Sequence, residues 1–401
     1  MSLSNLRQLR QRLHANPYVA NNEGWTAAAL YNFLRSQNVE ISHTRVNKSH
    51  GFIAKVVGCA RSSSPSGQSD SVLLRADMDA LPLHEETPNI PYLSQNDGCH
   101  HACGHDGHST MLAGALVALQ NDREHFHGEV YGLFQPAEET GEGAKQMLDG
   151  NIPLPTAGCF GLHNIPGAPM GQILLRDDGV AARASCGMSF VLEGKASHAS
   201  EPWLGISPAG VIGSLVLDNS PLMQLPQQLL DSGLIPPQIQ GGAVLATPVH
   251  LSIGSSGDYG ILPGNGKINL TLRADTTTDL DTLRDAVHAL IRKTSIAGGC
   301  QVKQMTVIEP FPATINTPER SNIVRAAAND CSLKVKTMKA PFPWSEDFAY
   351  YGERCDSGAV LFGVGSGEEC APLHSKHYDF PDQMIDIVVP LWVSIAKKAL
   401  Q

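Results

Sequence analysis

The stretch from Cys99 to His108 concentrates side chains that bind metal ions. Its sequence, CHHACGHDGH, holds two cysteines, four histidines and one aspartate. Thiolate sulfur, imidazole nitrogen and carboxylate oxygen are the ligands of a borderline-soft divalent ion such as Zn2+. The alternatives are a solvated polar loop and a closed structural zinc site. A closed site needs a second pair of ligands, and no further CxxC or HxxxH pair follows downstream. The pattern therefore favours an open, catalytic metal site.

Further metal-type side chains follow three apolar runs that are typical of buried strands. The runs are 71–76, 129–135 and 159–162, and they are followed by Asp77, by the pair Glu138 and Glu139, and by His163. The carboxyl ends of parallel strands meet at one edge of a sheet, so these side chains are expected to lie together. As neighbours in an extended segment, Glu138 and Glu139 would point in opposite directions. One carboxylate could then bind metal while the other acts on the attacking water.

Hydrophobic periodicity predicts an α/β protein with a mostly parallel sheet covered by helices. Helices are expected within 4–16, over 26–34, over 109–120 with Ser109 as N-cap, and over 281–293 and 321–330. Additional strands are expected over 52–57, 189–193, 267–273 and 359–362. A turn is expected over 61–70 and a rigid connector over 310–312. Strands that alternate with helices are typical of a parallel sheet. From about residue 183 the alternation changes character, which predicts a smaller inserted α+β domain.

Composition argues against nucleic acid and membranes as partners. The chain has 401 residues, a formal net charge of −10 and 42% apolar residues, so it folds as a globular protein without an overall basic character. Its nine cysteines are scattered singly, which is typical of reduced thiols. The N-terminus has no apolar signal region, and no apolar run approaches the roughly 18 residues of a membrane span. We therefore expect a soluble, unprocessed cytoplasmic protein.

Spacing alone does not assign a role to several histidines outside the cluster. His163 would be an ordinary core residue in isolation, His374 and His377 would be surface residues, and His198 is too distant in sequence to be assigned. Two common hydrolase signatures, HExxH and GxSxG, are missing from the sequence. The chain is therefore neither a zincin nor a serine hydrolase with a nucleophile elbow.

Five motifs together resemble the M20 metallopeptidase family. They are RLHANP (12–17), RADMDALP (75–82), HACGHDGH (101–108), QPAEE (135–139) and SEDF (345–348). The likeness extends from near residue 5 to near residue 385, and the HACGHDGH string is highly specific. The chain is most similar to the amidohydrolase branch of the family, which includes hippurate hydrolases, N-acyl-amino-acid deacylases and plant auxin-conjugate hydrolases.

This resemblance implies a site with two divalent metal ions, Zn2+ or Mn2+, with Ni2+ or Co2+ as alternatives. The family pattern assigns the bridging ligand to Cys103 and the other ligands to His105, Glu139, His163 and His374. It assigns the general base to Glu138, oxyanion stabilisation to His198 and the grip on the substrate carboxylate to Arg273. Asp77 is a candidate for orienting a histidine ligand, because metal sites generally need such a partner.

The resemblance also implies a zinc-exopeptidase-like fold and a reaction. The catalytic domain would comprise 1–183 and 311–401, and a lid and dimerisation domain would comprise 184–310 and form a homodimer. The implied reaction is hydrolysis of the amide bond of N-acyl amino acids or similar small conjugates. The alternatives are a dipeptidase or aminoacylase of the same family, a non-catalytic ligand-binding relative and a structural zinc protein.

Three positions depart from the family pattern. Gly260 stands where an asparagine usually precedes Ile-Pro, Ser207 stands where an aspartate usually precedes proline, and Trp344 replaces a small glycine. All the metal positions remain intact. The departures therefore bear on the substrate, since a lost amide removes a polar contact and an indole would reshape the acyl pocket.

Overall fold

The computed structural model describes residues 3–60, 70–236 and 243–401, which form two compact units. Unit 1 consists of Met1–Ala181, Thr314–Met338 and Glu346–Gln401, and unit 2 of Ala182–Ala313 and Lys339–Ser345. The predicted boundaries at 183 and 310 lie within a few residues of these, although the prediction placed Lys339–Ser345 in the first domain. Most of the turn predicted at 61–70 lies outside the described residues.

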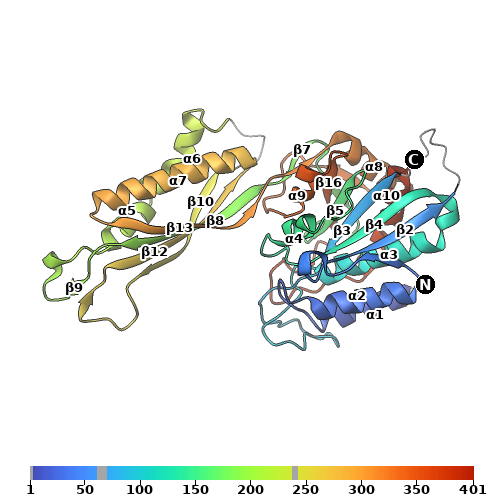
Figure 1. Cartoon of the computed structure of the whole chain (residues 1–401), viewed down its shortest axis with the longest axis horizontal. Helices are drawn as coiled ribbons and strands as arrows, with labels where there is room; N and C mark the ends of the chain where they lie inside the picture. The colour runs from blue at the N-terminus through green and yellow to red at the C-terminus, as the bar shows by residue number, and fades with distance from the viewer. Residues whose placement is uncertain (1–2, 61–69, 237–242) are drawn as a thin grey trace. The chain divides into compact units, whose positions relative to one another are not determined.

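Unit 1 is built around an eight-stranded sheet (Figure 1). Its strand order is β1 (Glu40–His43), β2 (Phe52–Cys59), β4 (His127–Gln135), β3 (Ser71–Asp77), β5 (Cys159–Ile165), β16 (Ala359–Gly365), β6 (Ile173–Leu175) and β15 (Val335–Thr337). The four central strands, from β4 to β16, are parallel, and antiparallel pairs flank them. This confirms the predicted mostly parallel α/β sheet.

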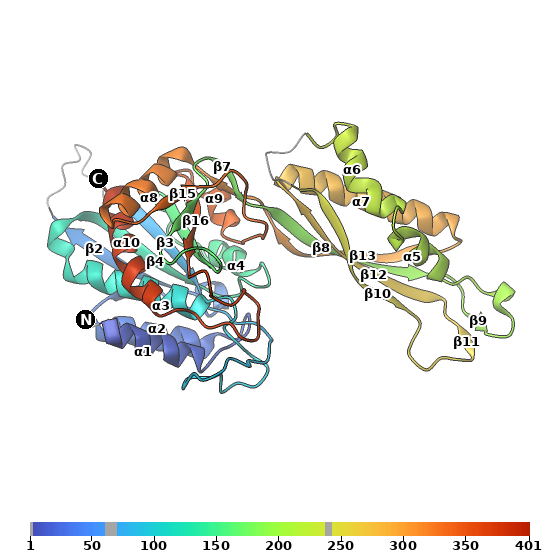
Figure 2. The same cartoon turned by 180° about the vertical axis from the view of Figure 1, so that it is seen from behind.

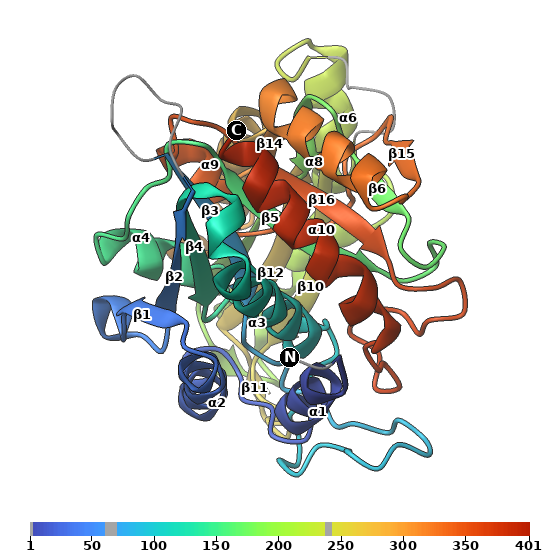
Figure 3. The same ribbon diagram turned by 90° about the vertical axis from the view of Figure 1, so that its right-hand side faces the viewer.

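Helices pack on this sheet through apolar faces. They are α1 (Leu3–His14), α2 (Gly24–Ser36), α3 (His105–Asn121), α4 (Gly143–Asp149), α8 (Pro318–Asp330), α9 (Ala349–Arg354) and α10 (Gln383–Ala399). In Figure 3, α3 and α10 run side by side along the sheet, with α1 and α2 next to α3 and α8 next to α10. Leu112, Phe160 and Trp392 are among the buried side chains of the shared core. The core fixes the carboxyl ends of the strands, where the predicted site begins.

Unit 2 is a four-stranded antiparallel sheet with helices on one face (Figure 2). The strands are β10 (Leu245–Ile253), β12 (Asn265–Ala274), β8 (Ala184–Glu193) and β13 (Gln301–Phe311), and the helices are α5 (Ala209–Val216), α6 (Pro221–Asp231) and α7 (Thr277–Ala297). Along β12, Ile268, Leu270 and Leu272 are buried and alternate with polar residues, as expected of a sheet with one covered face.

Short elements complete the described chain. Strands β9 (Ser197–His198) and β11 (Ile261–Leu262) pair with each other, as do β7 (Gly179–Ala182) and β14 (Thr314–Asn316). Single turns of 3-10 helix lie at Val46–Lys48, Arg123–His125 and Pro202–Leu204. All nine cysteines are free thiols. Among the described residues, no helix combines the length and apolar composition needed to cross a bilayer.

Three local predictions are wrong. Helix α3 begins at His105 after Gly104, whose φ is +91°, so Ser109 is not its N-cap but lies inside it and donates its hydroxyl to Asp77 O. Strand β5 runs on to Ile165 and therefore contains His163 instead of ending before it. The supposed connector at 310–312 begins with two residues of β13, because this strand extends to Phe311.

Candidate metal centre

Three buried ligand-type side chains meet at the carboxyl end of the central strands. Cys103 lies in the loop before α3, His105 is the first residue of that helix, and His163 lies in β5. Their ligand atoms lie within 4.8 Å of one another. The Cys103 Sγ atom is 3.4 Å from His163 Nε2. This geometry suits a metal ion with sulfur and nitrogen ligands.

Glu138 and Glu139 join these side chains from a turn rather than from an extended segment. The Gly141 N–H donates to Glu138 O at 2.8 Å, and Ala137 has a φ of +51°. One carboxylate oxygen of each glutamate and a nitrogen of His105 lie within 4.8 Å of one another. The expectation of an extended pair that points in opposite directions is therefore wrong, although both carboxylates do reach the cluster.

His374 completes the group from a distant part of unit 1. It has a φ of +61°, and its backbone N–H donates to Ala102 O at 2.8 Å, which ties its loop to the Cys103 segment. Its Nε2 atom lies 3.6 Å from Glu139 Oε2, and its side chain is 55% exposed. The structure thus brings all five predicted ligands and Glu138 together. His377 instead bonds Glu86 O through its Nδ1 atom.

The unpaired atoms of this cluster fit a divalent cation. His105 Nε2 and Glu139 Oε1 are buried and have no hydrogen-bond partner among the described residues. Burial, reinforced by neighbouring carboxylates, raises the pKa of Glu139 to about 7 and the pKa of Glu138 well above its usual value. Burial, followed by the effect of His108, lowers the pKa of His163 well below its usual value, so this imidazole is neutral. Crowded, buried carboxylates beside a neutral imidazole are what a cation relieves.

Two aspartates at the end of β3 position the histidines. Asp77, predicted to orient a ligand, accepts from His108 Nδ1 at 2.7 Å, and lies 3.7 Å from His105 Nε2. The Nδ1 atom of His105 faces Asp79, at 3.0 Å from its backbone oxygen and 3.2 Å from Oδ1. Asp79 Oδ2 also accepts from the Glu139 N–H at 3.0 Å. Sequence reasoning missed Asp79, although the Asp77-Met78-Asp79 alternation was visible.

The buried guanidinium of Arg75 binds side chains that lie next to the glutamate turn. Arg75 is 1% exposed and donates to Asp77, Glu346 and Asp347 at 2.6 to 2.9 Å. It also donates to Gln135 Oε1 at 2.8 Å, just before the turn. These residues lie within three of the family-like motifs, but their spacing in the sequence does not predict that they bind one another. They form an ion network whose members must all be present.

The remaining predicted site residues lie in unit 2. His198 is exposed on β9, where its Nδ1 atom lies 2.7 Å from Ser200 Oγ. Arg273 lies on β12 and donates to Ser345 Oγ at 3.1 Å. Burial, followed by the charge of Arg183, lowers the pKa of Arg273. Neither side chain belongs to the cluster of ligand atoms in unit 1.

The three departures from the family pattern also lie in unit 2. A Cβ atom on Gly260 would meet nothing within 4 Å. The Trp344 ring stacks on Phe342 with centroids 4.5 Å apart and an interplanar angle of 14°. Ser207 Oγ accepts from the Ala209 N–H at 3.3 Å. Each departure is accommodated without strain in its own unit.

Comparison with known proteins decides the family. The profile of peptidase family M20/M25/M40 matches residues 73–398. The chain belongs to this family. An uncharacterised hydrolase of Staphylococcus epidermidis is 30% identical over 391 residues, with 94% of each chain covered. The predicted family and the prediction that the chain is a metal-dependent hydrolase are therefore confirmed.

Solved structures confirm the fold of this M20 chain. A Bacillus subtilis protein, YXEP, described as a dinuclear metal binding peptidase from the M20 family, superposes with a TM-score of 0.77 at 23% identity, covering 98% of this chain and 97% of that one. An aminobenzoyl-glutamate utilization protein from Klebsiella pneumoniae has a TM-score of 0.68 at 15% identity, covering 98% and 95%. The zinc-exopeptidase-like α/β class predicted from the sequence is thus borne out.

A second group of ligand-type side chains in this M20 chain is already filled by its own hydrogen bonds. His14 lies 2.8 Å from Asp106 and 3.1 Å from Glu85, and His100 lies 3.5 Å from Glu85. Burial lowers the pKa of His14, but the hydrogen bonds to Asp106 and Glu85 outweigh it and raise that pKa to about 9. Both ring nitrogens of His14 are thus occupied by carboxylates of the protein itself.

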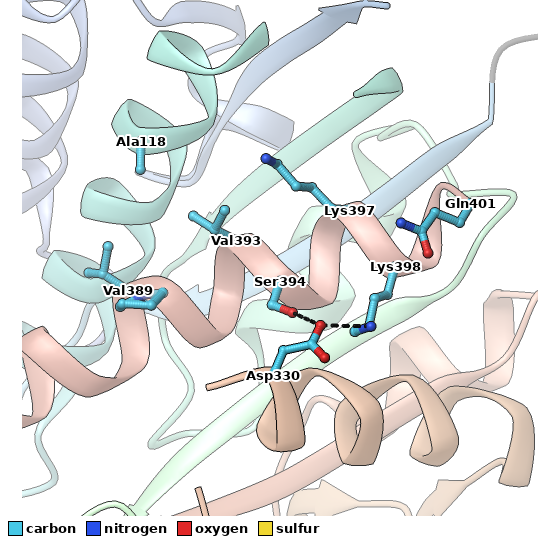
Figure 4. Close-up of a pocket in the computed structure, with 9 residues that line it drawn as sticks. Ala118, Asp330, Val389, Val393, Ser394, Lys397, Lys398 and Gln401 are labelled. Carbon is cyan, nitrogen blue, oxygen red and sulfur yellow. Dashed lines mark hydrogen bonds and ion pairs between the residues drawn. The ribbon is translucent and has the colours of Figure 1, made fainter. Parts of the chain in front are cut away.

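A groove of about 450 Å³ lies beside α10 on unit 1 (Figure 4). Lys398 Nζ is 2.7 Å from Asp330 Oδ2, and Lys397 pairs with Asp122. Figure 4 shows the Asp330 carboxylate pointing at Ser394 and Lys398. Both cations are neutralised, and no predicted ligand lines the groove, so it is no second candidate active site.

Proposed function

We propose that this M20 hydrolase cleaves the amide bond of N-acyl amino acids or similar small conjugates. The observation that supports this proposal most directly is the convergence of six ligand-type side chains, with buried atoms on His105 and Glu139 that no described residue bonds. Two divalent ions would be held by Cys103, His105, Glu139, His163 and His374. The structural likeness to an aminobenzoyl-glutamate utilization protein supports this substrate class, and the resemblance to the amidohydrolase branch points the same way.

The chemistry divides between the metal pair and Glu138. When bound, two divalent ions supply Lewis acidity and lower the pKa of a shared water. Glu138 takes the proton of the attacking water and passes it to the nitrogen of the leaving amine. Burial and the charge of Glu346 raise the pKa of Glu138. A carboxylate with a raised pKa is a stronger acceptor for the proton of the attacking water, and its protonated form then donates that proton to the leaving amine.

Unit 2 is proposed to choose the substrate. Arg273 would hold the carboxylate of the amino acid, and His198 would stabilise the oxyanion that forms at the amide carbon. We also propose a homodimer formed through unit 2 and a cytoplasmic location. These four assignments rest on the sequence and its family resemblance.

The test is hydrolysis by metal-reloaded enzyme. The chain is stripped with a chelator and reloaded with Mn2+, Zn2+, Ni2+ or Co2+, and then given N-acetyl- and N-benzoyl-amino acids. Two metal ions per chain and metal-dependent release of the free amino acid are expected. Matched dipeptides differ from these substrates by a free amine. If the dipeptides are cleaved faster, the dipeptidase alternative replaces the proposal.

Binding of metal without turnover of any compound in the panel would contradict the proposal. That outcome would favour the non-catalytic ligand-binding relative, which Gly260 and Trp344 suggest. Loss of the fold on chelation with a single bound metal would favour a structural zinc protein.

A further inference from the structure

The residue before Glu138 is held in an unfavourable backbone conformation. Ala137 has a φ of +51° and is fully buried. This left-handed region disfavours any residue with a Cβ atom. A strained non-glycine residue persists only where its surroundings over-determine it, and such residues gather at functional sites. The contacts of Ala137 therefore show which side chains fix the orientation of the glutamate turn.

One buried side chain from outside the turn binds the Ala137 N–H. Glu23, which directly precedes α2, is fully buried, and its Oε1 atom accepts the Ala137 N–H at 2.9 Å. The same atom accepts the Asn21 N–H at 2.8 Å. The other carboxylate oxygen, Oε2, has no hydrogen-bond partner in the part of the chain that the structure describes. Oε1 therefore joins the segment before α2 to the peptide that precedes the proposed base.

The opposite side of the turn is anchored independently. Asp79 Oδ2 accepts the Glu139 N–H at 3.0 Å, and Ala137 O accepts the Gly143 N–H at 3.0 Å. Glu138 thus lies between two residues, Ala137 and Glu139, whose N–H groups are bound by buried carboxylates. Ala137 O also accepts the Glu142 N–H at 3.3 Å and the Thr140 hydroxyl at 3.4 Å, so contacts within the turn hold the Ala137 oxygen, whereas Glu23 holds its N–H from outside the turn.

We infer that Glu23 is a positioning residue, which aims the Glu138 carboxylate by holding the Ala137 peptide in its left-handed conformation. This inference rests on the proposed function, in which Glu138 transfers the proton. The restraint requires an acceptor oxygen and no charge. A glutamine at position 23 keeps such an oxygen, whereas a methionine of similar length does not.

The experiment compares Glu23→Met, Glu23→Gln and their combinations with Ala137→Gly in the metal-loaded chain. We expect Glu23→Met to lower kcat by about tenfold or more, with KM and metal content retained, because holding Ala137 at positive φ costs at least that factor. Glu23→Gln should keep kcat within about threefold of wild type and leave its pH profile in place. Ala137→Gly should restore part of the kcat lost in Glu23→Met, because glycine adopts positive φ freely.

A matched control lies at the same junction. Glu142 is exposed and accepts from Asn21 Nδ2 at 2.9 Å without contacting Ala137 through its side chain. Glu142→Ala should change kcat by less than about twofold, as for an ordinary surface contact. If Glu23→Met does not fold, Glu23→Asp, which withdraws the acceptor by one methylene, should show the same kcat loss and glycine rescue.

Additive effects of Glu23→Met and Ala137→Gly on kcat would overturn the inference, as would a Glu23→Gln variant as impaired as Glu23→Met. If the wild type hydrolyses no compound in the panel, the proposed function fails separately. The positioning role is then decided by the thermal unfolding midpoints of wild type, Glu23→Met, Ala137→Gly and the double variant. A non-additive shift supports the restraint, and an additive shift refutes it.

Discussion

The candidate site side chains of unit 1 and the predicted substrate-contacting side chains of unit 2 differ in how firmly they are held. His105 is fully buried and faces Asp79 through Nδ1. In contrast, His198 is exposed and its Nδ1 atom meets only a nearby serine and its backbone N–H. Buried, mutually bonded groups are expensive to disturb, and exposed ones are not. The side chains of the proposed chemistry are thus fixed by the fold of unit 1, and substitutions in unit 2 should change activity without changing stability.

The largest expected effect comes from removing the buried guanidinium of Arg75 in unit 1. Arg75→Met leaves Asp77, Glu346 and Asp347 without a counterion, so the free energy of unfolding should fall by about 3–5 kcal/mol. Urea denaturation of the metal-free chain measures this loss. The matched control in unit 2 is Lys303→Met. This substitution breaks an exposed pair with Glu193 at 2.7 Å and should cost at most about 1 kcal/mol. Equal losses in both variants would remove the contrast between the units.

The next effect is a pH dependence of stability in unit 1. Although burial opposes it, hydrogen bonding to Asp106 and Glu85 raises the pKa of His14 to about 9. Because the folded pKa lies above the usual value of 6.5, the stabilisation is complete below pH 6.5 and is lost as the pH rises through about 9. The charged and titratable groups around this imidazole are Arg10, Tyr92, His100, His101, Asp106 and Glu85.

Comparison with His14→Gln isolates this contribution. Across that pH range the wild type should lose up to about 3 kcal/mol of unfolding free energy relative to the variant. Urea denaturation of both chains at a series of pH values checks the difference. Parallel curves for the two chains would show that His14 is neutral in the folded protein.

The sequence predicted the strands of unit 1 and the candidate ligands at their ends for a clear physical reason. Apolar runs mark buried parallel strands, and ligand-type residues follow them, so the convergence of Glu139 and His163 was foreseeable. Cys103 and His374 were assigned by the family resemblance instead. The turn at Glu138 was not foreseeable, because it depends on a positive φ at Ala137 and on Glu23, which is 114 residues away in the chain. Propensity carries no information on such contacts. The same limit hid the role of Asp79.

A smaller effect is expected from Arg273 in unit 2. Arg273→Gln should raise KM for an N-acyl amino acid by about 10- to 100-fold, the loss of a charge-assisted contact to the carboxylate. The unfolding free energy should change by less than about 1 kcal/mol, since the side chain donates to Ser345 Oγ and Pro343 O and to no other described residue. Steady-state kinetics with an N-acyl amino acid and its amide, which lacks the carboxylate, separate the two contributions. A KM that rises equally for both substrates would argue against carboxylate binding.

The smallest effect is expected at Gly260. A side chain there meets open space, and the backbone does not require glycine, so Gly260→Asn should leave stability within about 0.5 kcal/mol. If the missing amide shapes substrate choice, kcat/KM for acetyl- or benzoyl-amino acids should rise by up to about tenfold. A panel of acyl groups measured on both chains decides this. Unchanged values throughout the panel would exclude Gly260 as a determinant of specificity.

The most direct test of the proposed roles of Glu138 and Glu139 compares substitutions of these two neighbouring glutamates. Glu138→Ala and Glu139→Ala are prepared alongside wild type, and metal per chain and turnover of an N-acyl amino acid are measured on the same samples. Glu138→Ala should keep its metal while turnover falls by at least about 10²- to 10⁴-fold, the usual contribution of general acid–base catalysis. Glu139→Ala should lose metal. Loss of metal from Glu138→Ala, with metal retained by Glu139→Ala, would contradict the assignment and reverse the two roles.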